Sequence, residues 1–221
     1  MLHSKIPHIN ANNHLQFITY RLSDSLPHNI VEKIKQDISL FDEDKKTTER
    51  IKLVEKYSDK GYGASFLIHP NIADLIITNL KFHNLIKYEL ISWVIMPNHI
   101  HILIKQMNDN IGDIVKSWKS YTSKIILKQS NILFEKKGLY QPNVKVLNDI
   151  LNSRNIWYKG YWDRYLRNED EYWRCVEYIH NNPVKAKLVE SAKEWQFSSV
   201  VDFFKIENKK FWYGKDEPDY V

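Results

Sequence analysis

The sequence contains only one cysteine, Cys175, among its 221 residues. A single thiol excludes an intramolecular disulfide and any metal site built from several thiolates, and it fits a reducing cytoplasm. No segment reaches the roughly 20 apolar residues that span a bilayer, and the first residues lack the apolar core of a signal peptide. We therefore expect a cytoplasmic protein without a membrane partner, in which Cys175 packs in a helix.

Internal repeats, low-complexity tracts and an obvious interdomain linker are also missing from the sequence. Its charge is nearly balanced, with 32 Lys and Arg against 27 Asp and Glu, a net charge of +5 and a pI near 9.0. This mild basic excess permits a nucleic acid partner without requiring one. We predict a single domain over residues 1–221, with a helical elaboration at 30–60 and a C-terminal extension at 190–221.

Hydrophobic patterning predicts four strands. Residues 15–22 alternate and are rich in β-formers, and residues 88–104 are continuously apolar except at Met96-Pro97-Asn98, which predicts two strands joined by a tight turn. A last strand is expected at about 161–167.

Helical periodicity predicts one or two exposed helices within residues 30–60 and further helices at 71–86 and 110–130. We interpret residues 131–156 as irregular. In the helix at 110–130 one side is expected to be apolar, formed by Ile114, Trp118, Tyr121 and Ile125.

A final helix follows the last strand. Asn168, with Glu171 three residues later, is typical of a helix N-cap, and we expect Pro183 to end the helix. The order β-α-β-β-α-β-α predicts an α+β fold, a ferredoxin-like antiparallel sheet with helices packed on one face.

The stretch "MPNHIHILI" places two histidines one residue apart in a predicted strand. Because strand side chains alternate, His99 and His101 share one face while Ile100, Ile102 and Ile104 share the other. Two imidazoles at this spacing can converge on one metal ion. Spacing alone favours ordinary hydrogen-bonded or surface histidines, since such pairs arise easily, and a metal site needs a third ligand from elsewhere.

The best candidates for a partner lie in "VEYIHNNPV". Tyr178 and Asn182 are four residues apart, so a helix presents them side by side. An amide oxygen suits Mg²⁺ or Mn²⁺, and a phenol beside the ion could attack phosphorus. With 13 tyrosines in the chain, a packing role for Tyr178 is the plainer interpretation of this motif by itself.

Taken together, these blocks resemble the single-tyrosine HUH transposases, the IS200-like family. "PNHIHILI" resembles the histidine-hydrophobic-histidine motif, and "EYIHNNPVKAKLV" resembles the tyrosine helix of the subgroup associated with repetitive extragenic palindromes (REP). Further blocks match in the family's order, namely "ITYRLSDSLP", "GYGASFLIHPNIADLI", "SWKSYTSK", "YWDRYLRNEDEYW" and "EWQFSSV". Residues 30–60 and 138–155 depart from these blocks, and Lys187 stands where the family usually has a small residue.

The resemblance implies an HUH endonuclease core and an enzyme that cleaves and rejoins single-stranded DNA. Tyr178 would be the nucleophile and would form a 5′-phosphotyrosine intermediate. His99, His101 and Asn182 would hold Mg²⁺ or Mn²⁺. No dedicated base is evident from the sequence, and His180 is expected to point away from the nucleophile.

The resemblance also implies a DNA partner, single-stranded or hairpin DNA of palindromic repeats, a nucleoid-associated location in the cytoplasm, and a monomer or homodimer. Each lysine considered for DNA contact could equally be plain solvated surface, and Trp118 is favoured as a core residue. Asp163 could accept a hydrogen bond from a base or support a metal-binding histidine. The candidates for phosphate contacts are Lys116, Lys119, Lys124, Arg164 and Arg167, and those for base stacking are Trp118, Trp157, Tyr161 and Trp162.

Two other function classes compete with this interpretation. A DNA- or RNA-binding regulator would keep the fold without the chemistry, and a metal-dependent hydrolase would use water as the nucleophile. The intact set of His99, His101 and Tyr178 favours the enzyme over the regulator.

Overall fold

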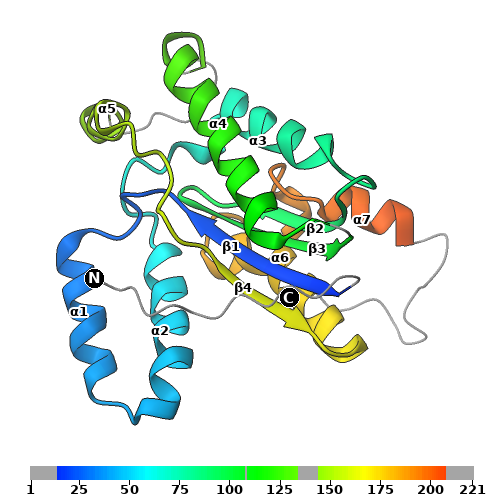
Figure 1. Cartoon of the computed structure of the whole chain (residues 1–221), viewed down its shortest axis with the longest axis horizontal. Helices are drawn as coiled ribbons and strands as arrows, with labels where there is room; N and C mark the ends of the chain where they lie inside the picture. Colours follow the sequence, from blue (N-terminus) through cyan, green and yellow to red (C-terminus); the bar gives the residue numbers. More distant parts are fainter. Residues whose placement is uncertain (1–13, 108, 134–143, 208–221) are drawn as a thin grey trace.

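The structure, a computed structural model, describes residues 14–107, 109–133 and 144–207, and at its centre lies a four-stranded antiparallel sheet (Figure 1). Its strand order is β2-β3-β1-β4. This is the ferredoxin-like order, so the predicted α+β fold class is confirmed. The strands are β1 (Leu15–Arg21), β2 (Tyr88–Ile95), β3 (His99–Gln106) and β4 (Trp162–Leu166).

Seven α-helices and two short 3₁₀ helices, Phe66–Ile68 and Ala192–Glu194, surround the sheet within the described residues. None of these helices is both long enough and apolar enough to cross a bilayer. The α-helices are α1 (His28–Ser39), α2 (Glu43–Ser58), α3 (Pro70–Phe82), α4 (Ile111–Leu133), α5 (Val144–Ser153), α6 (Glu169–Lys185) and α7 (Val200–Glu207).

The central hairpin forms where the sequence predicts it. The backbone N–H of Met96 donates to the carbonyl of His99 at 2.9 Å and closes the turn that contains Pro97. β3 then runs between β2 and β1, with His101 opposite Val94 on one side and Thr19 on the other. The two histidines therefore lie in an interior strand of the sheet.

Helices cover both faces of the sheet, so the expectation that they pack on one face is wrong. α3 and α4 cover the face of Ile100 and Ile102, while α6 and α7 cover the opposite face, where Leu103 lies. The physical reason is visible in β3, whose residues from His99 to Ile104 are buried at both parities, so both faces of the strand need a covering layer.

The first core is tied together by buried hydrogen bonds as well as by apolar packing. Trp118 Nε1 of α4 donates to the hydroxyl of Tyr88 at 2.9 Å, and that hydroxyl donates to the carbonyl of Leu80 in α3 at 2.7 Å. Trp157 Nε1 donates to Thr122 Oγ1 at 2.9 Å. Trp118 and Trp157 are thus core residues.

Two predictions about the helices in this region need correction. Tyr121 is 49% exposed, because the buried side of α4 continues through Thr122 and Ile126 instead. Residues 144–153, interpreted as irregular, form α5, whose Leu147 and Ile150 pack into the first core. The polar sequence around this short helix hides its apolar stripe.

Residues 28–58 form a helical hairpin, α1 and α2, that stands beside the sheet (Figure 1). A small core of its own holds the two helices together, formed by Leu26, Ile30, Ile34 and Tyr57. The predicted helical elaboration is therefore two helices. The predicted extension at 190–221 is described only as far as residue 207.

The start of α6 is confirmed and its end is not where Pro183 predicted it. The Asn168 side chain accepts from the N–H of Glu171 at 2.9 Å, as an N-cap does. The helix continues past Pro183 to Lys185. Pro183 is buried, and its carbonyl accepts from the N–H of Leu188 at 2.9 Å, so the last turn is closed from beyond the proline.

This closure is a Schellman motif, and it sets Lys187 in a strained conformation. The N–H of Lys187 bonds the carbonyl of Val184 at 2.9 Å, and Lys187 has φ of 60°. This left-handed region favours glycine.

Replacing Lys187 with glycine should therefore raise the free energy of unfolding by about 1 kcal/mol, net of the entropy that glycine adds to the unfolded chain. Urea unfolding of Lys187→Gly and the parent measures this difference. Lys187→Ala is the matched control, because it removes the same exposed charge but keeps a Cβ. Equal stabilisation by alanine would show that charge, not backbone strain, is responsible.

Candidate active site

His99 and His101 lie on the same face of β3, as the alternation predicts, but they are buried and do not face an open groove. Their side chains are 1% and 0% exposed, and the ring centroids are 4.8 Å apart. The His101 ring stacks on Phe17 of β1 at 5.5 Å. Since α6 covers this face of the sheet, both imidazoles sit beneath that helix.

Hydrogen bonds at Nδ1 fix the orientation of both rings. His99 Nδ1 lies 2.7 Å from Asn98 Oδ1, and Asn98 in turn donates through Nδ2 to the carbonyl of Tyr62 at 2.9 Å. His101 Nδ1 lies 2.7 Å from Thr19 Oγ1. An amide oxygen can only accept, so His99 carries its proton on Nδ1 and leaves a lone pair on Nε2.

Both Nε2 atoms are available as ligands. Within the described part of the chain neither His99 Nε2 nor His101 Nε2 has a hydrogen-bond partner. Burial lowers the pKa of His99 to about 3 and lowers the pKa of His101 well below its usual range. The two imidazoles are therefore neutral at neutral pH, the form that binds metal ions.

α6 brings Tyr178 and Asn182 to the histidine pair. The Tyr178 ring centroid lies 5.3 Å from that of His101 and 5.7 Å from that of Phe17. Asn182 is fully buried, and both of its amide atoms lack hydrogen-bond partners among the residues that the structure describes. Two pairs of side chains, about 80 residues apart in the sequence, therefore meet on one face of the sheet.

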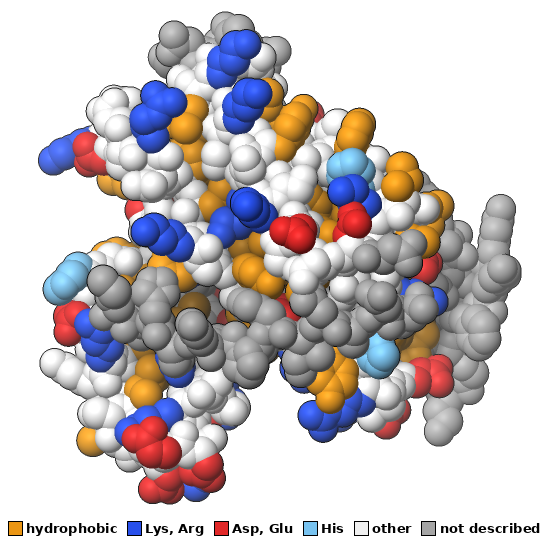
Figure 2. Space-filling model, viewed as in Figure 1, with side chains coloured by type: hydrophobic (Ala, Val, Ile, Leu, Met, Phe, Trp, Pro, Cys, Tyr) orange, Lys and Arg blue, Asp and Glu red, His pale blue; other side chains and the backbone are white. Residues whose placement is uncertain are grey.

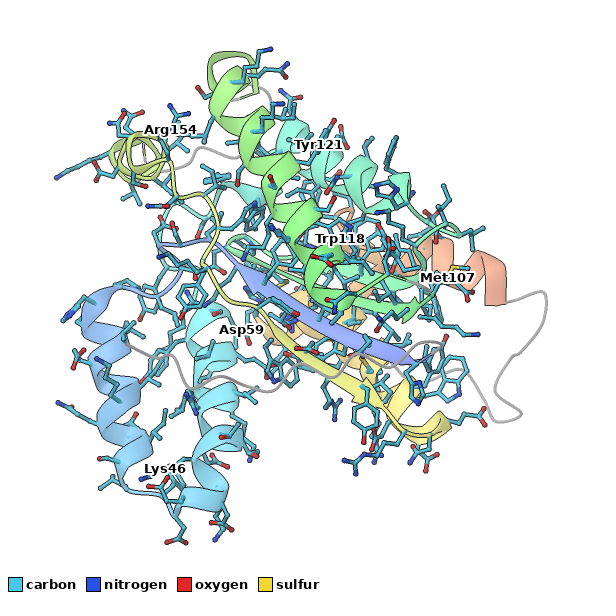
Figure 3. The ribbon with its side chains drawn as sticks, in the orientation of Figure 1. Lys46, Asp59, Met107, Trp118, Tyr121 and Arg154 are labelled. Atoms are coloured by element: carbon cyan, nitrogen blue, oxygen red, sulfur yellow. The ribbon has the colours of Figure 1, made fainter. Side chains whose placement is uncertain are left out.

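The end of α2 adds two carboxylates that the sequence did not reveal. Asp59 Oδ1 lies 3.6 Å from His99 Nε2, and Asp59 Oδ2 lies 4.0 Å from Lys185 Nζ. Figure 3 shows Asp59 at the end of α2, beside the sheet. In the sequence Glu55 and Asp59 stand in a run of charges that reads as a solvated helix, so only the tertiary packing of the hairpin could identify them.

Glu55 lies near the Tyr178 hydroxyl and affects its pKa. Burial raises the pKa of Tyr178 above its usual range, with Glu55 and Asp59 raising it further. Burial also raises the pKa of Glu55 to about 7, against the opposing effect of Lys185. The Tyr178 hydroxyl makes no hydrogen bond of normal geometry with any described residue, although Glu55 and Asn182 are close enough to influence it.

The donor set fits a hard divalent cation only if the amide takes part. In the described residues, no group of three His, Cys, Asp or Glu side chains is arranged to hold a metal ion. Two neutral imidazole nitrogens and the amide oxygen of Asn182 are all buried, and none of the three has a hydrogen-bond partner in the described ranges. These are suitable ligands for Mn²⁺ or Mg²⁺.

The predicted phosphate contacts fall on two different faces. Arg164 and Trp162 lie on β4 in register with Phe17 and Thr19, on the histidine face of the sheet. Arg167, exposed, lies with its guanidinium 5.4 Å from the Tyr165 ring. The lysines of α4 lie on the opposite face.

On that opposite face the lysines differ in their surroundings. Lys116 and Lys124 are exposed. Lys119 Nζ donates to the backbone carbonyls of Tyr158, Lys159 and Gly160 at 2.6, 3.0 and 3.3 Å, and burial lowers its pKa to about 8. All three of its donors are thus used within the protein, so Lys119 positions this loop.

A basic hollow lies between α4 and the segment after α5. Its volume is about 450 Å³, and Arg154 and Lys159, which the sequence analysis did not single out, add charge to it. Lys and Arg side chains gather over α4 and α5 on the face shown in Figure 2. The residues Lys116, Lys119, Arg154 and Lys159 make this hollow an electropositive surface.

Asp163 and His180 lie outside the cluster around Tyr178. Asp163 is in register with Ile18, whose side chain belongs to the α3 and α4 side of the sheet, so it does not support the metal histidines. His180 Nε2 lies 3.0 Å from Ser92 Oγ and 3.1 Å from Ser199 Oγ. This buried contact fixes α6 against β2.

The sequence and fold are similar to those of known transposases. Residues 76–182 match the family described as IS200-like transposases. The chain is 27% identical over 112 residues to a REP-associated tyrosine transposase of Escherichia coli, and 25% identical over 114 residues to a protein of Haemophilus influenzae given the same description. Each alignment covers 51% of this chain, and 54% and 58% of the respective relative, so it spans little more than half of each.

The fold is also found in a solved structure. The chain superposes on a REP-associated tyrosine transposase bound to a REP hairpin with a TM-score of 0.56 and 17% identity, covering 99% of this chain and 96% of that one. At this identity the likeness establishes the fold alone.

The contact of His180 with Ser92 and Ser199 predicts a pH-dependent stability. Burial lowers the pKa of His180 from 6.5 to about 4, so below pH 6.5 the unfolded chain binds more protons and the free energy of unfolding falls toward pH 4. A His180→Gln variant lacks this loss. The free energy of unfolding of the parent, minus that of the variant, should therefore decrease by about 2 kcal/mol from pH 7 to pH 5. Urea unfolding at the two pH values measures this difference. A difference that stays constant would contradict the lowered pKa of His180.

Proposed function

We propose that this chain, whose residues 76–182 match the family described as IS200-like transposases, cleaves and rejoins single-stranded DNA beside palindromic hairpins. The observation that carries this proposal is the meeting of Tyr178 with His101, 5.3 Å apart by ring centroids, on the face that also holds His99 and Asn182. A nucleophile and a set of metal ligands on one surface are what phosphodiester transfer requires.

In the proposed reaction the Tyr178 oxygen attacks the scissile phosphorus. A bond forms between this oxygen and phosphorus, the bond to the 3′-oxygen breaks, and the DNA is left with a 5′-phosphotyrosine and a free 3′-hydroxyl. Glu55, whose pKa burial raises to about 7, is the nearby carboxylate that accepts the phenolic proton. Attack by another 3′-hydroxyl reverses the step and rejoins DNA without a nucleotide cofactor.

His99, His101 and Asn182 would hold the divalent ion, Mg²⁺ or Mn²⁺. When bound, the ion supplies Lewis acidity at the phosphate oxygens. The chain contributes orientation, because Asn98 and Thr19 hold the two imidazoles at Nδ1 and direct Nε2 of each ring toward the ion, and the amide oxygen of Asn98 leaves His99 Nε2 unprotonated. Such outer-shell partners commonly change metal affinity about 10- to 100-fold.

Substrate binding is proposed to use both faces of the sheet. The basic hollow formed by Lys116, Arg154 and Lys159 suits the phosphates of a hairpin stem. Arg164 and Trp162, on the histidine face, would contact the single-stranded flank, and Arg167 would extend that contact. The solved transposase of the same fold was bound to a REP hairpin, which supports this class of DNA as substrate.

A denaturing gel separates the proposed activity from its two alternatives. With a labelled hairpin and single-stranded flank from beside this gene, plus Mn²⁺, we expect a covalent protein-DNA adduct. Tyr178→Phe should abolish it, a loss of at least 1,000-fold, because the nucleophile is gone. Tyr172→Phe, on the same helix, is the matched control and should retain it. Cleavage without adduct would indicate a hydrolase, and binding without cleavage a regulator.

Metal binding can be tested without turnover. Titration of Mn²⁺ into the DNA-free protein, followed by calorimetry or electron paramagnetic resonance, should show one site. Thr19→Val removes the hydroxyl at His101 Nδ1 with little change in shape and should weaken Mn²⁺ about 10-fold. Thr47→Val, exposed on α2, is the control. Unchanged affinity in Thr19→Val would contradict the role of His101 as a ligand.

A further inference from the structure

A cavity of about 120 Å³ lies between α2, the end of β1 and the residues that lead into β4. The space inside it has no role in the sites described above, although Thr19, Glu55 and Trp162 belong to its lining. Its lining is mainly apolar and aromatic, including Ile51, Val54, Tyr158, Tyr161 and Trp162. An apolar cavity of about 150 Å³ can hold a benzene ring, so this space is on the scale of one flat aromatic ring.

Polar groups stand at defined places in this lining. Arg50 and Glu55 both reach the cavity from α2. Arg50 Nε is buried and has no hydrogen-bond partner in the described ranges of the chain. An unsatisfied buried donor and a carboxyl group that line the same cavity indicate a ligand with both acceptors and donors on its edge.

The aromatic walls differ in what they can offer. The Tyr158 ring is already covered by the Arg21 guanidinium, whose Cζ lies 3.9 Å from the ring centroid. Trp162 packs its edge against Phe17 at 5.3 Å and is only partly buried. The indole of Trp162 is therefore supported by Phe17 and forms part of the cavity wall, where a base could stack on it.

The cavity adjoins the proposed chemistry through two side chains. Thr19, part of its lining, bonds His101 Nδ1 at 2.7 Å. Glu55, also part of its lining, is the carboxyl group beside the Tyr178 hydroxyl. A ring bound here thus lies one side chain away from both a metal ligand and the nucleophile.

We propose that this cavity receives one unpaired nucleobase of the DNA, from a nucleotide next to the scissile phosphate. Such a base is a flat ring with hydrogen-bonding edges, which matches an aromatic wall together with Arg50 and Glu55. Binding it would fix the position of the adjoining phosphate over Tyr178. The inference rests on the proposed function and adds a subsite for the substrate.

The test measures DNA binding in a Tyr178→Phe background, so that chemistry does not contribute. Fluorescence anisotropy is recorded with the hairpin and its single-stranded flank, in which each flank nucleotide in turn is made abasic. An abasic nucleotide at one position of the flank should weaken binding about 5- to 150-fold, the range expected for the loss of one stacked base. Ile51→Trp, which fills the cavity, should weaken the binding of intact DNA by a similar factor. In this variant, the abasic nucleotide at the sensitive position should cause no further loss of affinity.

Thr48→Trp is the matched control, because Thr48 is exposed on the same helix; it should keep the affinity and the abasic effect. Val54→Phe is a second filling variant, used if Ile51→Trp does not give the parent's circular dichroism. The proposal would be overturned if Ile51→Trp or Val54→Phe still lost the full amount of DNA affinity when the base was removed. It would also be overturned if no abasic position in the flank weakened binding. A failure to form the Tyr178 adduct in the separate gel assay would instead count against the proposed function, since this binding assay does not depend on it.

Discussion

The packing of α6 against the histidine face of β3 is the constraint on which the rest of the site depends. β3 is an interior strand, so its side chains cannot shift without disturbing β1 and β2 as well. The period of two puts both imidazoles on one face, and the helical spacing of four puts Tyr178 and Asn182 on one side of α6. The strand period and the helical spacing together produce a four-residue cluster when α6 packs on the sheet. The buried contact of His180 with Ser92 holds α6 in this position.

Burial of this cluster has an electrostatic consequence. Neutral imidazoles and an uncharged phenol tolerate a low-dielectric surrounding, whereas a lone carboxylate does not. Lys185 balances Asp59 and Glu55 at the end of α2, which allows two acidic groups to approach the histidines. The site therefore combines a rigid neutral part from the sheet and α6 with a charged part from the hairpin. This combination suits a cation and an anionic phosphate arriving together better than either one alone.

The sequence predicted best what depends on local periodicity. The four strands, the turn at Pro97 and the N-cap at Asn168 follow from neighbouring residues, and the structure confirms them. The helices were expected on one face of the sheet, but α6 and α7 cover the second face, because element order does not specify which face a helix packs on. Pro183 was wrongly taken as a stop, since burial of its ring and capping from beyond it outweigh the lost hydrogen bond.

What the sequence could not predict is the contribution of the α1 and α2 hairpin. Glu55 and Asp59 look like the other charges of an exposed helix, and their approach to Tyr178 and His99 follows from tertiary packing that no local pattern specifies. The same packing creates the cavity, whose two walls, α2 and the start of β4, are about 110 residues apart. In the proposed function, the hairpin would shape the substrate-facing side of the site, while the histidines and the tyrosine helix are held in place by the sheet. In the proposed function, specificity and chemistry would be carried by different parts of the fold, which meet where Glu55 and Asp59 approach Tyr178 and His99.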